Sequence, residues 1–204
     1  NKEDLNIYNV LINEVSLKEV IKKTFIENLD IVPSNINLTG AEVELVNERE
    51  REFKLKNAVD KIKNNYDLIF IDSPPSLGLL TLNALVSADS VIIPLQCEFY
   101  AMDGLGQLLS TINLVKENLN PAITIEGVLI TMFDSRTNLS VQVVKEVKNK
   151  FKEKVYETLI PRNIRLSEAP SFGKPINFYD KNSKGGVAYI NLAKEILSKL
   201  NGKG

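Results

Sequence analysis

The sequence predicts an α/β fold, in which a mostly parallel, doubly wound sheet carries helices on both faces. Three apolar runs, at 68–71, 91–95 and 127–131, are continuous rather than alternating, as in strands that are covered on both faces. Segments with the apolar spacing of helices separate these runs. Strand–helix alternation of this kind is typical of βαβ units, which place the carboxyl ends of parallel strands at one edge of the sheet.

The composition is that of a globular protein, and we expect residues 1–204 to form a single domain. Apolar residues make up 44% of the chain and charged residues 25%, which are ordinary values. The chain has no histidine and one cysteine, Cys97, which excludes an internal disulfide and nucleophilic sites that use a histidine base. No apolar run is long enough to span a bilayer, and we expect a cytoplasmic protein.

The residues before the first long apolar run predict mainly helix. Ser16–Glu19 has the pattern of a capping box and predicts a helix that continues to about Glu27. Residues 29–35 predict a short strand that Pro33 ends. Between Thr39 and Asn64 the spacing of apolar residues predicts a helical segment.

The second half of the chain predicts the remaining strands and helices. Val155–Ile160 has the composition of a further strand. The last predicted helix carries one apolar stripe, which we expect to pack on the core. The stripe consists of Tyr189, Leu192, Ala193, Ile196, Leu197 and Leu200. The helices predicted in this half cover Leu79–Ser87, Asp103–Asn118, Leu139–Phe151 and Val187–Leu200.

Charge is distributed unevenly along the chain. Residues 145–204 hold 13 Lys and Arg against 6 Asp and Glu, whereas residues 1–144 hold 12 against 20. This asymmetry predicts that the C-terminal part faces a polyanion. The alternative is that lysine-rich helix faces in this part are only solvated.

Asp72 stands at the end of the first apolar run and is followed by Ser73 and Pro74. Proline cannot continue a β-ladder, so the chain turns here. In phosphate-binding α/β domains an aspartate at this place orients Mg²⁺ through a bound water. The alternative is an ordinary turn in which Asp72 caps the following helix.

Three long stretches closely resemble the ParA/Soj family of chromosome- and plasmid-partitioning ATPases. They read YDLIFIDSPPSLGLLTLNALVSADSVIIPLQCEFYAMDGL, LITMFDSRTNLS and IPRNIRLSEAPSFGKPI, and they occur in that order. The resemblance implies a fold of the P-loop NTPase type and a switch that binds ATP with Mg²⁺. It also implies a nucleotide-dependent homodimer that coats DNA without sequence preference, on the nucleoid. A ParB-type centromere-binding partner would stimulate hydrolysis and so release the DNA.

The resemblance also assigns roles to individual residues. Asp72 matches the Walker B position of the family, and Ser73 and Pro74 match the loop that senses the γ-phosphate. The other nucleotide-binding residues that it implies lie at a strand end (Met132 and Asp134) and in the loop beside the adenine (Pro161, Arg162 and Asn163).

The phosphate-binding loop of the family is absent from the 204 residues. Lys184–Val187 imitates the start of that loop, but no apolar strand precedes it, and we interpret it as a chance match. Also absent are the second strand of the family and its hydrolytic aspartate. The chain starts at Asn1 and holds only two methionines, so we expect a preceding segment that supplies these parts. Without it, we expect the 204 residues neither to bind ATP tightly nor to hydrolyse it, and no catalytic residue is assigned.

Basic residues beside the signature loops are our candidates for binding DNA phosphates. They are Arg165, Lys174, Lys181 and Lys184, which Lys148, Lys152 and Lys154 would extend. The alternative function is that of a non-catalytic remnant, which has lost the nucleotide pocket but still binds DNA or a partner. MinD, a related division-site ATPase, is disfavoured because its C-terminal membrane helix is lacking.

Overall fold

The computed structural model describes residues 5–74 and 76–202. These residues form two compact units, one from residues 5–89 and 110–123 and the other from residues 90–109 and 124–202. In the described part of the chain, no helix is both long and apolar enough to cross a lipid bilayer.

The second unit contains the parallel sheet that the sequence predicts. Strand β3 (Ser90–Gln96) pairs in parallel with strand β4 (Thr124–Thr131), from Ser90 opposite Thr124 to Gln96 opposite Thr131. The register shifts once, between Val91 and Ile92. The α/β class with a parallel sheet is therefore confirmed, and so are the strands at 91–95 and 127–131.

The segment 155–160 lies beside β4 but does not form the regular strand that we expected. The amide of Tyr156 donates a hydrogen bond of 3.0 Å to Val128, and the amide of Ile160 donates one of 2.9 Å to Ile130. Five residues of this segment, 156–160, thus run beside three residues of β4, 128–130. A regular ladder needs equal numbers on both sides, so the pairing reduces to separate bridges.

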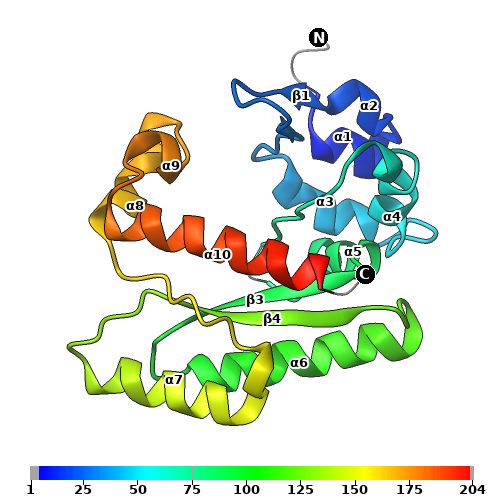
Figure 1. Cartoon of the computed structure of the whole chain (residues 1–204). Helices are drawn as coiled ribbons and strands as arrows, with labels where there is room; N and C mark the ends of the chain where they lie inside the picture. Colours follow the sequence, from blue (N-terminus) through cyan, green and yellow to red (C-terminus); the bar gives the residue numbers. More distant parts are fainter. Residues whose placement is uncertain (1–4, 75, 203–204) are drawn as a thin grey trace. The chain divides into compact units, whose positions relative to one another are not determined.

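Helices cover both faces of this sheet (Figure 1). Helix α10 (Lys184–Asn201) packs on one face, where its residues Ala188 and Leu192 join a core with Leu129 of β4. Helix α7 (Asn138–Phe151) and residues 101–109 of α6 (Ala101–Asn118) lie on the other face. The shorter helices of this unit are η3 (Lys152–Lys154), α8 (Ile164–Glu168), η4 (Ala169–Phe172) and α9 (Ile176–Tyr179).

Helix α10 buries only part of the stripe that we expected. Tyr189 and Leu197 are 42% and 50% exposed, whereas Ala188 and Leu192 are buried and Ile196 packs against them. The buried stripe follows i, i+4, i+8 from Ala188.

The first unit is mainly helical, and its core gathers Val10, Leu17, Val20 and Ile62. Its final helix, α5 (Leu79–Ser87), has the bounds that the sequence predicts. The remaining elements are α1 (Ile7–Asn13), α2 (Leu17–Val20), β1 (Lys22–Lys23), β2 (Asp30–Ile31), α3 (Leu38–Leu45), α4 (Lys54–Val59) and η2 (Lys63–Asn65).

Three local predictions in this unit are wrong. The helix that Ser16 caps ends at Val20, because the chain becomes extended and β1 pairs antiparallel with β2. The strand expected at 29–35 is only the two residues of β2. The segment between Thr39 and Asn64 is not one helix but α3, α4 and η2, since a non-glycine residue with positive φ, Glu50, interrupts it.

The apolar run at 68–71 does not form a strand either. Leu68, Ile69 and Phe70 are 46%, 40% and 73% exposed. A strand is stabilised by hydrogen bonds and side-chain pairs with a neighbouring strand. The described residues provide no such neighbour for this run, so its composition alone does not produce a ladder.

Candidate functional site

Asp72 lies at the end of this unpaired apolar segment, in the first unit. Its side chain is exposed, and it lines a groove of about 580 Å³ together with Ser73 and Pro74. The groove walls are otherwise largely apolar and include Ile31 and Phe70. Within the described residues, no hydrogen bond or ion pair occupies the Asp72 carboxylate, which is therefore available to an external ligand.

The turn after Asp72 is held by the helix that follows it. Thr81 of α5 donates from Oγ1 to the carbonyl oxygens of Pro74, at 3.2 Å, and Ser76. Asp72 does not cap α5, because the N-cap is Gly78 and no side chain bonds to the cap position. The capping alternative for Asp72 is thus wrong.

Asp72 fits a magnesium ion that is held mainly by a phosphate and water. The described part of the chain has no cluster of three or more His, Cys, Asp or Glu that could hold a metal by itself. Magnesium retains several waters and is typically bound by one or two carboxylates plus substrate phosphates. A single available carboxylate at a groove suits that kind of coordination.

The second unit gathers the other residues that the resemblance assigns to the nucleotide. Directly after β4, Met132 has a φ of 53°, which is unusual for a residue with a side chain. The amide of Phe133 then donates to Ile160 at 3.0 Å, and the amide of Arg162 donates to Phe133 at 3.0 Å. These bonds bring the loop after β4 beside the loop at 161–163.

Asp134 is held by an arginine that the sequence analysis missed. Arg136 donates from Nε to Oδ1 at 2.9 Å and from Nη2 to Oδ2 at 2.6 Å, and its amide also donates to Oδ1. The side-chain bonds from Arg136 hold the pKa of Asp134 well below its usual range. Both carboxylate oxygens are thus engaged. The D-x-R spacing after a strand was the signal that could have indicated this pair.

Asn163 has a structural partner next to it. Its Oδ1 accepts a hydrogen bond of 3.0 Å from the amide of Arg165 and so caps α8. Its side chain therefore sets the direction in which the chain leaves the loop at 161–163.

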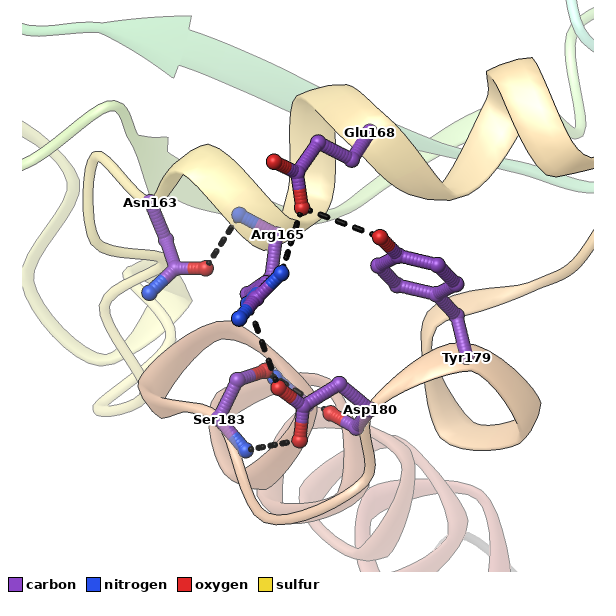
Figure 2. A network of polar contacts seen from close by, with 7 residues as sticks. Asn163, Arg165, Glu168, Tyr179, Asp180 and Ser183 are labelled. Carbon is purple, nitrogen blue, oxygen red and sulfur yellow. Dashed lines mark hydrogen bonds and ion pairs between the residues drawn. The ribbon is translucent and has the colours of Figure 1, made fainter.

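Arg165 is the centre of a polar network (Figure 2). Its guanidinium donates to Glu168 at 2.9 Å, and its Nε lies 3.5 Å from a carboxylate oxygen of Asp180. Tyr179 donates to the same oxygen of Glu168 at 3.0 Å, and the amide of Ser183 donates to Asp180 at 3.0 Å. This network joins α8, α9 and the start of α10, and sequence reasoning did not find its acidic members.

The three candidate lysines differ from Arg165. The side chains of Lys174, Lys181 and Lys184 are exposed, and none of them forms an ion pair with another described residue. By contrast, Lys148 pairs with Glu157 at 2.9 Å, and Lys154 donates to the Ile125 carbonyl at 3.2 Å.

The glycines at 185 and 186 have a packing role. They lie in the first turn of α10, which Ser183 caps by accepting from the Gly186 amide at 3.1 Å. A Cβ at Gly186 would lie 2.5 Å from the Asp180 carbonyl oxygen, and one at Gly185 would lie 2.5 Å from Leu166. Lys184–Val187 thus forms the packed first turn of a helix, which agrees with our interpretation of its likeness to the phosphate-binding loop as a chance match.

Comparison with known proteins decides the family. A family model described as an AAA domain matches residues 1–125. The sporulation initiation inhibitor protein Soj of Bacillus subtilis is 56% identical over 192 residues, which cover 94% of this chain and 76% of that protein. The chain belongs to the ParA/Soj family. The chromosome partitioning protein ParA of Myxococcus xanthus is 55% identical over 95% of this chain and 68% of its own length.

Solved structures agree with this ParA/Soj assignment. Cobyrinic acid a,c-diamide synthase from Mycobacterium smegmatis, with bound ADP and magnesium, is similar with a TM-score of 0.81 and 35% identity. The match covers 98% of this chain and 74% of that chain. The cell division ATPase MinD of Pyrococcus furiosus has a TM-score of 0.75 at 20% identity, a likeness of fold. The P-loop NTPase fold class is therefore confirmed.

Proposed function

We propose that the protein is an ATP-dependent switch for DNA segregation, in which residues 1–204 are part of one ATPase domain. The observation that carries this proposal is Asp72, an exposed carboxylate without a partner among the described residues, in a chain 56% identical to Soj. A carboxylate in this state is available to Mg²⁺.

The nucleotide-binding residues that we propose are those that the resemblance assigns. Asp72 would hold Mg²⁺ through water, while Ser73 and Pro74 form the turn beside it. Pro161, Arg162 and Asn163 would lie beside the adenine and contact it mainly through their backbone and by stacking. Met132 and Asp134 would stand at the base-recognition position. Bound Mg²⁺ would neutralise phosphate charge during transfer to water. This assignment is supported by a relative 35% identical to this chain that was solved with ADP and magnesium.

We further propose that the 204 residues alone do not bind ATP tightly, because they contain no phosphate-binding glycine loop. Calorimetric titration with Mg·ATP tests this weak binding and the proposed role of Asp72. The protein from its complete reading frame should bind with micromolar affinity, and the 204-residue chain should not. Asp72→Asn should weaken Mg²⁺-dependent binding, whereas Asp67→Asn, at the start of the same segment, should not. Tight binding by the 204-residue chain would disprove the proposal that these residues alone bind ATP weakly.

The proposed DNA-binding residues are Arg165, Lys174, Lys181 and Lys184. Non-specific binding uses cations that contact phosphates and release counterions, so the affinity falls steeply with salt. The exposure of the three lysines, without an ion pair inside the described part of the chain, supports their role.

Fluorescence anisotropy with a random duplex tests this role. Replacing Lys174, Lys181 and Lys184 by alanine should reduce the slope of log affinity against log salt by ~2.7, about 0.9 for each lost phosphate contact. Replacing Lys18, Lys61 and Lys116 changes the charge equally and should leave the slope unchanged. Equal slopes for all three proteins would contradict the proposed surface.

The remaining parts of the proposal concern assembly. The protein would dimerise when ATP is bound, bind the nucleoid in that state, and be released by hydrolysis that a ParB-type partner stimulates. The alternative is a remnant that binds DNA without a nucleotide. DNA binding that rises with ATP and falls with ADP supports the switch, and binding that is indifferent to both supports the remnant.

A further inference from the structure

Glu42 of α3 places a carboxylate against the start of α5, a contact between residues 36 positions apart. A Cβ added to Gly78, the N-cap of α5, would overlap all three atoms of the Glu42 carboxyl group. Only a glycine lets the carboxylate approach the helix start this closely. Any other side chain at position 78 would displace the carboxyl group of Glu42, which is the flexible end of that side chain.

The carboxylate in this contact is incompletely satisfied. Glu42 Oε1 is buried, and no group in the described part of the chain donates a hydrogen bond to it. Such an oxygen costs free energy unless a donor reaches it. The carboxyl group lies against Gly78 at the start of α5, where the helix dipole favours a negative charge.

The start of α5 is also connected to the proposed magnesium ligand. Thr81, in the first turn of α5, bonds the carbonyl oxygens of Pro74 and Ser76. These two residues belong to the turn that follows Asp72. A shift of the first turn of α5 is therefore transmitted to the chain that carries the Asp72 carboxylate.

We propose that Glu42 is a positioning residue, which sets the first turn of α5 and through it Asp72, because its carboxylate lies directly against the N-cap residue Gly78. The consequence for Mg²⁺ rests on the proposed function, whereas the contact between Glu42 and Gly78 does not.

A double-mutant cycle tests the contact in the protein from its complete reading frame. Thermal unfolding is measured for Glu42→Ala, Gly78→Ala and the double variant. Gly78→Ala should lower Tm when Glu42 is present, because the new methyl group overlaps the carboxylate. The same change should lower Tm by less than half as much in the Glu42→Ala background, because the obstacle is gone. Additive losses would overturn the proposal.

The Mg²⁺ requirement of nucleotide binding tests the positioning role. Glu42→Gln keeps the size of the side chain, so it should leave Tm nearly unchanged and raise the half-saturating Mg²⁺ concentration about tenfold, as removal of an outer-shell partner does. Glu19→Gln, at an exposed position of α2, is the matched control and should change neither.

The outcomes separate the two proposals. An unchanged Mg²⁺ requirement in Glu42→Gln, with normal binding by the wild type, would overturn the positioning role. Absence of Mg²⁺-dependent nucleotide binding in the wild type itself would overturn the proposed function, and the cycle with Gly78 would then decide alone whether Glu42 positions α5.

Discussion

Arg165 and Glu168 form a hydrogen-bonded ion pair of 2.9 Å within one turn of α8 (Figure 2). The bond from Arg165, followed by the one from Tyr179, lowers the pKa of Glu168. Asp180 lies on the other side of the guanidinium at 3.5 Å. A DNA phosphate that binds Arg165 must therefore compete with two carboxylates of the same unit.

Removal of one competitor should strengthen DNA binding. We expect Glu168→Gln to raise the affinity for a random duplex about threefold to tenfold at low salt, because Arg165 becomes available and one negative charge is lost. Glu153→Gln changes the net charge equally at an exposed position of η3 and separates the two causes. If both variants bind DNA equally well, net charge alone explains the gain and the competition is refuted. Anisotropy titrations measure both.

Glu195 of α10 should stabilise the irregular segment beside β4. Its carboxylate accepts hydrogen bonds from the amides of Glu157, at 2.8 Å, and Thr158, at 3.0 Å. We expect Glu195→Ala to lower the free energy of unfolding by about 1–3 kcal/mol, since two amides lose an ionised acceptor. Chemical denaturation measures this, with Glu153→Ala as the exposed control.

The contribution of Glu195 should also depend on pH. Burial raises the pKa of Glu195, but the hydrogen bonds from the two amides more than offset this and leave it below the ordinary value of 4.5. A lowered pKa means that the stabilisation is present above 4.5 and is lost as the pH falls through the lower, folded value. The stability difference between wild type and Glu195→Gln should therefore shrink below pH 4.5. A difference that stays constant down to acid unfolding would contradict this.

Asn83 should be one of the most sensitive positions of the first unit. It is 1% exposed, accepts from the amide of Leu55 at 3.0 Å and donates to the carbonyl oxygens of Arg51 and Leu79. Asn83→Ala leaves buried backbone groups unpaired and should cost about 3 kcal/mol of unfolding free energy. Asn118→Ala removes only an exposed bond within α6 and should cost far less. If Asn83→Ala and Asn118→Ala lose equal unfolding free energy in denaturant, the difference in burial does not determine the cost.

Two glycine-to-alanine substitutions should have opposite effects on stability. At Gly104 of α6 an added Cβ meets no atom within 4 Å, and Gly104→Ala should raise the free energy of unfolding by about 0.5–1 kcal/mol through helix propensity. At Gly186 the Cβ would overlap the backbone of Asp180 and Lys181, so Gly186→Ala should lower Tm. A higher Tm for Gly186→Ala would show that the turn before α10 rearranges to accommodate the added methyl group.

Local pattern was sufficient for most of the regular elements. The continuous apolar runs at β3 and β4, and the apolar spacing in α5, α6, α7 and α10, depend only on neighbours in sequence, and each element formed within three residues of its expected bounds. Asp72 could likewise be singled out, since an acidic residue between an apolar run and prolines is a feature of the sequence itself.

Tertiary structure decided what depends on partners distant in the chain. The run at 68–71 has the composition of a strand, yet residues 5–74 and 76–202 offer it no neighbouring strand, and it forms no ladder with them. Whether Arg165 is available or engaged depends on Asp180, and whether Gly78 is free or crowded depends on Glu42. Hydrogen bonds and close contacts act over a few ångströms of space, so sequence distance does not encode them. The sequence thus determined which residues can act, and the tertiary structure decided which of them are already engaged.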